Sequence, residues 1–257
     1  MASPAENKPT FLLVTGAWHQ PAFYQPTKDA LTALGYECVV PQMKAQGPDS
    51  AGVTWEADVS AIMEAATPLF EAGKEVVLIA HSYGGIPGTA VTKGQGVAER
   101  AAQGKRGGFH SIIFVAAFAI PQRGLDLLQT FGGQYPPWLK GAQPYSKNHL
   151  CTVAEDAQPI FCNDFTEEDT KKAFSLLLPQ SQDSFETPAD FVASDITIPK
   201  TYVICELDQV FPVPLQEMLV KSTPGLKEAR IHASHGPFVS QPQPLAELIV
   251  KIVAGEQ

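Results

Sequence analysis

Three residues have types and positions suited to nucleophilic catalysis: Ser82, Asp208 and His235. Each follows an apolar, strand-like run, and they occur along the chain in the order serine, acid, histidine. A serine hydroxyl needs a nearby base, and histidine suits this role because its pKa lies near neutral pH. A buried carboxylate keeps the imidazole in the required tautomer and stabilises its charged form. We therefore expect a triad with Ser82 as nucleophile, His235 as general base and Asp208 as the orienting acid.

The serine lies in the segment Ala80–Gly85, which reads AHSYGG. It follows the most apolar run of the chain, Glu75–Ala80, and precedes a helical pattern, which is the context of a G-x-S-x-G nucleophile elbow. Such a turn needs small neighbours, and Gly84 and Gly85 provide them, although Ala80 replaces the first glycine. The pentapeptide alone also fits an ordinary strand-to-helix turn with a capping serine. The prediction of a triad therefore depends largely on the presence of the acid and the histidine.

Other residues compete for the same roles. Glu206 precedes Asp208 by two residues and is the rival acid, and Asp126 is a weaker rival beyond an earlier strand. His232 is a rival base, but we expect it to lie within its strand as a core residue. His81 is expected to pack beside the elbow.

An oxyanion hole requires two backbone N–H donors near the serine. The residue after the nucleophile, Tyr83, supplies one, and the loop after the first strand supplies the other. That loop reads Val-Thr-Gly-Ala-Trp-His, and we choose the N–H of Ala17. Gly16 allows close backbone approach, although it also fits a plain turn. These residues and the large aromatic side chains of the chain predict a substrate pocket that includes Gly16, Trp18, His19 and Trp138.

Short β-branched runs alternate with helical patterns, which predicts a mostly parallel, doubly wound α/β sheet with helices on both faces. The expected strands cover residues 11–15, 36–40, 75–80, 111–117, 201–205 and 229–232, and the expected helices cover 29–34, 55–70, 83 onward, 214–220 and 244–254.

One segment, residues 121–193, interrupts this alternation. It is rich in proline and aromatic residues, and only Thr166–Phe174 has a clear helical pattern, with Thr166 as its N-cap. Long insertions in compact domains are usually functional. We expect a mainly helical cap over a core formed by residues 1–120 and 194–257. The alternative is an irregular surface excursion.

Composition restricts the function classes. The 257 residues carry a net charge of −9, with a pI near 5.1, which argues against nucleic acid or an anionic membrane as partner. The first ten residues show no secretory signal, so we expect a cytoplasmic protein. No metal-ligand spacing is present. Cys151 and Cys162 are close enough in sequence to pair, but reduced thiols are favoured because no export signal is visible.

Four segments together resemble the α/β-hydrolase superfamily, in particular fungal hydrolase-like proteins related to plant methylesterases and hydroxynitrile lyases. They are Phe11–His19, Ala80–Gly88, Cys205–Gln209 and Ser234–Phe238. The resemblance implies a cap over the site, no cofactor and ester-like or lactone-like substrates. Carried over by motif, Ser82, Asp208 and His235 form the triad, and Ala17 with Tyr83 supplies the oxyanion donors.

Two positions depart from these relatives. Many have His-Gly where this chain has Thr15-Gly16, and the hydroxynitrile lyases have a lysine after the catalytic histidine, where this chain has Gly236. We expect Gly236 to suit a tight turn and to leave room for a hydrolytic water.

The sequence thus favours a serine hydrolase that cleaves a small, largely apolar carboxylic ester or lactone through an acyl-enzyme on Ser82. One alternative uses the same triad for a lyase, decarboxylase or cyclase step in secondary metabolism. Another is a ligand-binding, receptor-like protein with slow turnover. The oligomeric state and the identity of the small-molecule substrate stay open.

Overall fold

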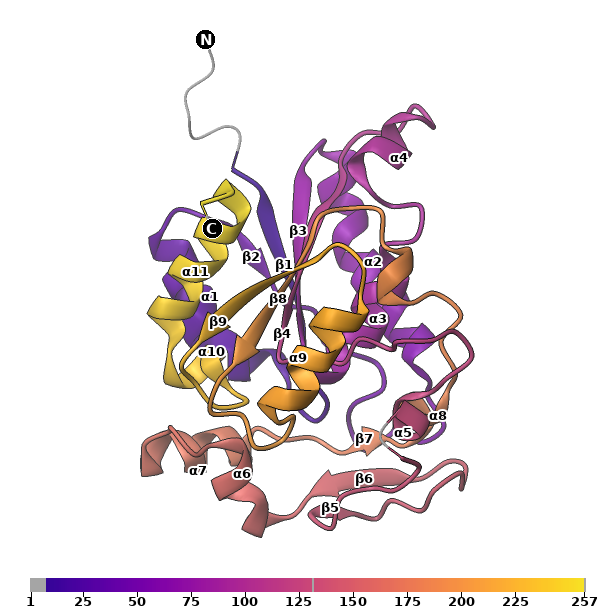
Figure 1. The fold of residues 1–257 in the computed structure, drawn as a ribbon, viewed down its shortest axis with the longest axis vertical. Coiled ribbons are helices and arrows are strands. Elements are labelled where there is room, and N and C mark those ends of the chain that lie inside the picture. The colour runs from indigo at the N-terminus through magenta and orange to yellow at the C-terminus, as the bar shows by residue number, and fades with distance from the viewer. Residues whose placement is uncertain (1–7, 131, 257) are drawn as a thin grey trace.

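The computed structural model describes residues 8–130 and 132–256. Its centre is a six-stranded sheet of order β2-β1-β3-β4-β8-β9, in which every neighbouring pair is parallel (Figure 1). The strands are β1 (Thr10–Val14), β2 (Cys38–Val39), β3 (Glu75–His81), β4 (Gly108–Val115), β8 (Lys200–Cys205) and β9 (Leu226–Ile231). The prediction of a mostly parallel sheet is confirmed, although β2 is shorter than expected.

Side chains alternate between two hydrophobic cores along each central strand. In β3, Val77 and Ile79 belong to one core, and Val76 and Leu78 belong to the other. This follows from the period of two in a strand. A parallel sheet covered on both faces therefore reads as a continuous apolar run, which is why β3 could be recognised from sequence.

Helices cover both faces of the sheet (Figure 1). One core contains residues of α1 (Gln25–Ala33) and α11 (Pro242–Ala254), and the other contains residues of α2 (Trp55–Glu71) and α9 (Val213–Ser222). In α2 the buried Ile62, Ala66 and Phe70 recur every four residues and so share one face. The remaining core helices are α3 (Gly85–Val91), α4 (Val97–Ala101) and α10 (Pro237–Ser240), and single 3₁₀ turns cover Pro21–Tyr24, Ser82–Gly84 and Ala193–Asp195.

Most of the described part of residues 121–193, a segment that we call the cap, lies beyond the carboxyl ends of the parallel strands, at the bottom of Figure 1. This segment contains α5 (Leu127–Thr130), β5 (Leu139–Lys140), β6 (Leu150–Val153), a 3₁₀ turn (Glu155–Ala157), α6 (Gln158–Phe161), α7 (Glu167–Ser175), β7 (Gln180–Ser181) and α8 (Asp183–Glu186). Helix α7 begins as expected, because the Thr166 hydroxyl accepts the Asp169 N–H at 3.1 Å.

The segment also forms a small sheet that the sequence did not predict. Strands β5, β6 and β7 pair antiparallel. Each is two to four residues long, which is too short to show a period of two.

Two sequence-based expectations concern the chain ends and membranes. The expectation of no secretory signal rests on the first ten residues. Residues 1–7 lie outside the described residues, so this expectation stays a prediction. Among the helices that the structure describes, none has the length and apolar character needed to span a bilayer.

Candidate active site

Ser82 lies in the sharp turn between β3 and α3. Its backbone φ is +51°, in the left-handed region that is strained for a residue with a side chain. A Cβ on Gly84 would lie 2.6 Å from the Thr15 carbonyl oxygen, and one on Gly85 would lie 2.3 Å from the Phe118 carbonyl oxygen. Both positions therefore require glycine, and the turn has the close packing of a nucleophile elbow.

His235 bridges the serine and the acid. Its Nε2 is 2.9 Å from Ser82 Oγ, and its Nδ1 is 2.7 Å from Asp208 Oδ2. Asp208 Oδ1 accepts the N–H groups of Val210 at 2.8 Å and Phe211 at 2.9 Å, which fixes the carboxylate. The side chains of His235 and Asp208 are 2% and 0% exposed. With Nδ1–H donated to Asp208, the Nε2 lone pair faces the serine hydroxyl, as a general base requires.

The rival residues lie elsewhere. Glu206 is 38% exposed and its carboxylate is 3.3 Å from His232 Nδ1. Asp126 Oδ1 accepts the Gln129 N–H at 2.6 Å at the start of α5. The expectation that His232 is a core residue is wrong: β9 ends at Ile231, and the His232 side chain is 75% exposed. Sequence could not show this, because β9 is an edge strand with a solvent-facing side.

His81 packs beside the elbow, with its ring centroid 4.9 Å from that of His235. Its Nε2 is 2.8 Å from the His235 carbonyl oxygen and its Nδ1 is 2.8 Å from Tyr24 Oη. Burial, and then the nearby His235, lowers the pKa of His81 well below its usual value, so it is neutral. A carbonyl only accepts, so Nε2 carries the proton and Nδ1 accepts from the Tyr24 hydroxyl.

The cap contacts the loops that carry the acid and the histidine. Asn163 Nδ2 donates to the Leu207 carbonyl at 2.9 Å, and Asp164 Oδ2 accepts the Ser234 N–H at 3.0 Å. Each of these core residues directly precedes Asp208 or His235. The cap therefore contributes to the placement of both side chains.

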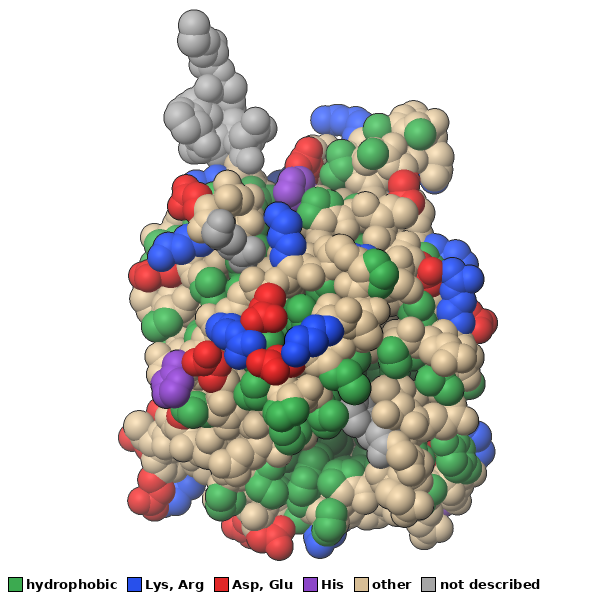
Figure 2. Space-filling view, in the orientation of Figure 1, with side chains coloured by type: hydrophobic (Ala, Val, Ile, Leu, Met, Phe, Trp, Pro, Cys, Tyr) green, Lys and Arg blue, Asp and Glu red, His purple; other side chains and the backbone are tan. Residues whose placement is uncertain are grey.

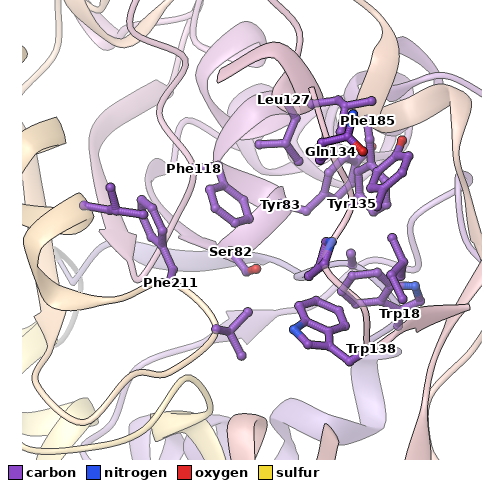
Figure 3. Close-up of a pocket in the computed structure, with 16 residues that line it drawn as sticks. Trp18, Ser82, Tyr83, Phe118, Leu127, Gln134, Tyr135, Trp138, Phe185 and Phe211 are labelled. Atoms are coloured by element: carbon purple, nitrogen blue, oxygen red, sulfur yellow. The ribbon is translucent and has the colours of Figure 1, made fainter. Parts of the chain in front are cut away.

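A large cavity opens at Ser82, with a volume of about 420 Å³. Figure 3 shows Ser82 on its wall, with aromatic rings from the core and the cap around it. The lining residues are Ala17, Trp18, Ser82, Tyr83, Phe118, Leu127, Leu128, Gln134, Tyr135, Pro136, Trp138, Leu139, Phe185, Val210, Phe211 and Leu215. This volume suits a small organic molecule, and the walls are predominantly apolar.

The structure brings four of the expected non-triad residues to this cavity: Ala17, Trp18, Tyr83 and Trp138. Trp18 and Trp138 contact each other edge to face, with centroids 5.9 Å apart. Tyr83 donates its hydroxyl to the buried Asp58 Oδ2 at 2.7 Å, which anchors the residue that follows the serine.

Gly16 does not line this cavity and lies behind the serine. A Cβ at this position would lie 2.8 Å from His81 Nδ1 and 3.1 Å from Ser82 Cβ. The expectation that Gly16 forms part of the pocket wall is therefore corrected: its role is close packing against the elbow.

His19 is also displaced from the expected position. Its Nδ1 is 2.7 Å from the Ala17 carbonyl oxygen, and its ring packs against Phe23, with centroids 4.2 Å apart. It lines a separate void of about 10 Å³ together with Phe161 and His235. Burial, and then the nearby His235, lowers the pKa of His19 to about 3. His19 is thus a neutral core histidine that contacts the loop at Ala17 and does not line the cavity at Ser82.

Gly236 is closely packed in the direction of a side chain, although with His235 it borders the small void of about 10 Å³, so room for a hydrolytic water stays a prediction. A Cβ there would lie 2.7 Å from Phe165 Cζ and 3.3 Å from Phe23 Cζ. Phe165 belongs to the cap, so this contact depends on a long-range packing that the sequence near His235 does not show.

Sequence reasoning missed most of the apolar wall, including Phe118, Phe185 and Phe211. Phe118 and Phe211 come shortly after the carboxyl ends of β4 and β8. That position was itself a usable signal, because ligands of open α/β sheets bind beyond these ends. Phe185 lies in the cap, where no periodic pattern identifies inward-facing side chains.

The described residues form neither a metal-ligand cluster nor a disulfide. Within residues 8–130 and 132–256, no three His, Cys, Asp or Glu side chains converge as a metal site. Cys38, Cys151, Cys162 and Cys205 are free and buried. Burial raises the pKa of Cys151 and of Cys162 to about 12, which makes both thiols poor nucleophiles.

Residues 11–248 match the model of the alpha/beta hydrolase family. The chain is 30% identical over 250 residues to alpha/beta hydrolase nvfD of Aspergillus novofumigatus, with 97% of this chain and 98% of the relative covered. It is 27% identical over 250 residues to a pyrethroid hydrolase of Sphingobium wenxiniae, covering 93% and 85%. Polyneuridine aldehyde esterase shares the fold with a TM-score of 0.77 at 19% identity, covering 96% of this chain and 100% of the other. The protein belongs to the alpha/beta hydrolase family.

Proposed function

We propose that this chain is a serine hydrolase that cleaves a small, largely apolar carboxylic ester or lactone through an acyl-enzyme on Ser82. One observation carries the proposal: His235 Nε2 lies 2.9 Å from Ser82 Oγ at the wall of an aromatic cavity, while its Nδ1 is held by Asp208. A hydroxyl, a base and a buried acid in this order are the parts that acyl transfer needs.

The chemistry follows from the positions of these atoms. His235 Nε2 takes the Ser82 proton as Oγ attacks the carbonyl carbon, and the N–H groups of Ala17 and Tyr83 stabilise the oxyanion. The tetrahedral intermediate collapses, and the proton on His235 passes to the departing alkoxide, which leaves the acyl group on Ser82. Water then attacks this ester, again with His235 as base. The acid is released, and Ser82 regains its proton.

The cavity supports an apolar and partly aromatic substrate. Its walls include the rings of Trp18, Trp138, Tyr135 and Phe185, which bind flat apolar groups through large contact areas. One relative is named a pyrethroid hydrolase, which fits an ester of this character. A lactone places acyl and alcohol parts in one ring and uses the same steps.

The test compares Ser82→Ala with the wild type on a panel of aryl and alkyl esters, lactones and a pyrethroid. We expect turnover to fall by up to ~10⁶-fold, as in other serine hydrolases. Labelling of the wild type with a fluorophosphonate should add one phosphonyl group, which mass spectrometry locates on Ser82.

Ser240→Ala is a matched control. The Ser240 hydroxyl is buried in α10 and has no hydrogen-bond partner among the described residues. We expect this variant to keep wild-type turnover and labelling. Equal turnover by the wild type and a folded Ser82→Ala variant would remove the proposed mechanism.

A further inference from the structure

Side chains hold both polar backbone groups of Gly16. Its N–H donates to Tyr24 Oη at 2.7 Å, and its carbonyl oxygen accepts a hydrogen bond from Gln46 Nε2 at 2.8 Å. Gln46 comes from the loop after β2 and is 8% exposed. Neither Tyr24 nor Gln46 lines the large cavity, so their contribution to the site is indirect.

The Gly16 carbonyl and the Ala17 N–H belong to the same peptide group. This group is planar and trans, so its C=O and N–H point in opposite directions, and no cis peptide bond occurs among the described residues. Holding the Gly16 oxygen toward Gln46 therefore fixes the Ala17 N–H on the opposite side. Ala17 lines the cavity at Ser82, so this bond sets the direction of the N–H that faces the reacting carbonyl.

The orientation of the Gln46 amide is determined by its neighbours. The Gly16 carbonyl can only accept a hydrogen bond, so the Gln46 atom that faces it must be the NH₂ group. This nitrogen also lies 3.3 Å from Thr15 Oγ1, and Gln46 Oε1 accepts from Gln42 Nε2 at 3.0 Å. The amide is paired at both ends and has no equally good flipped arrangement.

Trp18, which follows Ala17 in the same loop, forms backbone hydrogen bonds with residues of the cap. Trp18 has a φ of +65°, a strained conformation that persists only when its surroundings fix it. Its N–H donates to Gln180 Oε1 at 3.2 Å, and its carbonyl accepts the Leu178 N–H at 2.8 Å. Gln46 and Gln180 also meet in an isolated antiparallel bridge. The loop is therefore fixed from the core on one side and from the cap on the other.

We propose that Gln46 is a positioning residue for the oxyanion hole: it aims the Ala17 N–H by holding the Gly16 carbonyl. The inference rests on the proposed function, in which this N–H stabilises the oxyanion. The Gly16 carbonyl also accepts the His19 N–H at the longer distance of 3.3 Å. Without the Gln46 donor, this weaker bond alone restrains the peptide, which can then rotate and present its carbonyl oxygen to the developing negative charge. The loss then falls on the transition state and not on the bound ester.

Two variants test this role. Gln46→Met keeps the approximate shape and removes the donor, and Gln46→Glu replaces the NH₂ group with an oxygen. Loss of a whole oxyanion donor costs ~10²–10³-fold in kcat, so for misorientation of one donor we expect a loss of roughly tenfold to a hundredfold, with KM within about twofold. Affinity for a boronic acid that forms a tetrahedral adduct with Ser82 should fall by the same factor. Affinity for the product alcohol should not change.

Gln95→Met is the matched control, since Gln95 lies in the loop before α4 and pairs with Arg100. Thermal unfolding of each variant verifies that it is folded. A wild-type kcat in either folded Gln46 variant would overturn the positioning role alone. So would a loss shared equally by the boronic acid and the product alcohol. Absence of Ser82-dependent hydrolysis in the wild type would overturn the proposed function, and the positioning role with it.

Discussion

Asp208 and Glu206 are two residues apart but lie in opposite environments. Asp208 is buried and bound to His235, whereas Glu206 is partly exposed beside His232. We predict that Asp208→Asn lowers kcat by about 10⁴-fold, because an amide at this position favours the wrong histidine tautomer. Glu206→Gln should change kcat by less than about twofold, since exposed ion pairs contribute little.

Steady-state kinetics on one ester measures both variants, and their circular dichroism spectra should match that of the wild type. If Glu206→Gln were the more damaging change, the assignment of the acid would be wrong.

His19 makes stability depend on pH. Its pKa is about 3 in the folded protein and near 6.5 when unfolded, so between these values the unfolded chain binds an extra proton. Stability therefore falls as pH decreases below 6.5, by up to ~1.4 kcal/mol per pH unit for one group. We predict that His19→Asn removes the contribution of His19 to the change in free energy of unfolding with pH. Asparagine retains a donor for the Ala17 carbonyl.

Urea unfolding of wild type and His19→Asn between pH 7 and 4.5 gives the two slopes. Parallel curves would contradict the prediction. The buried, neutral His81 contributes in the same direction in both proteins. Because His19 is one cause of the lowered pKa of His81, the difference between the slopes reports the loss of His19 together with its smaller effect on His81.

The convergence of Ser82, Asp208 and His235 could be predicted from sequence because these residues obey local rules. Each comes just after a strand, and their order along the chain is diagnostic of this fold. Tyr24, Gln46 and Gln180 could not be predicted in this way. Their partners are backbone groups of a distant loop, and no local pattern encodes such contacts.

The cap is the element whose structure was least predictable. Among the described residues of the cap, the longest helix is α7, which has a capping threonine and a charged first turn, and these signals allowed its prediction from sequence. The small sheet β5-β6-β7 and the contacts of Asn163 and Asp164 depend on where the chain returns to the core. Tertiary packing decides these features, so periodicity carries no information about them.

The cap also provides the most direct test of substrate selection. Trp138 contacts Trp18 and Phe161 and lines the cavity, but it is only half-buried. We predict that Trp138→Ala raises KM or changes acyl preference across an ester panel. The change in kcat/KM should exceed what the loss of stability explains, because the residue contributes more to the cavity wall than to the main core.

Kinetics on acetyl, benzoyl and naphthoyl esters, together with thermal unfolding, separates the two effects. Phe174→Ala is a suitable comparison, since Phe174 packs on Phe161 but does not line the large cavity. Unchanged kinetics for Trp138→Ala would show that its ring serves only the cap.

For the molecule as a whole, the parallel sheet and its two helical layers were predictable because they follow from strand and helix periods along most of the chain.

The reaction type depends on few positions within that frame. Cyanide release needs a positive charge near the leaving group, and the hydroxynitrile lyases that the sequence resembles have a lysine where this chain has Gly236. We therefore predict that mandelonitrile is cleaved more slowly than an ester of similar size.

Cyanide detection and ester hydrolysis under the same conditions provide the comparison. Faster cyanide release than ester hydrolysis, abolished in Ser82→Ala, would favour the lyase function.

The contact of Gly236 with Phe165 also constrains the order in which substitutions can accumulate. A lysine at position 236 would bring its Cβ within 2.7 Å of the Phe165 ring, so the side chain collides before its charge can serve any reaction. A smaller residue at position 165 must come first or together with it. The lysine is then harmful in one background and tolerated in the other, which is sign epistasis between the histidine loop and the cap. An evolutionary path that introduces this lysine would therefore begin in the cap or change the cap and the histidine loop together.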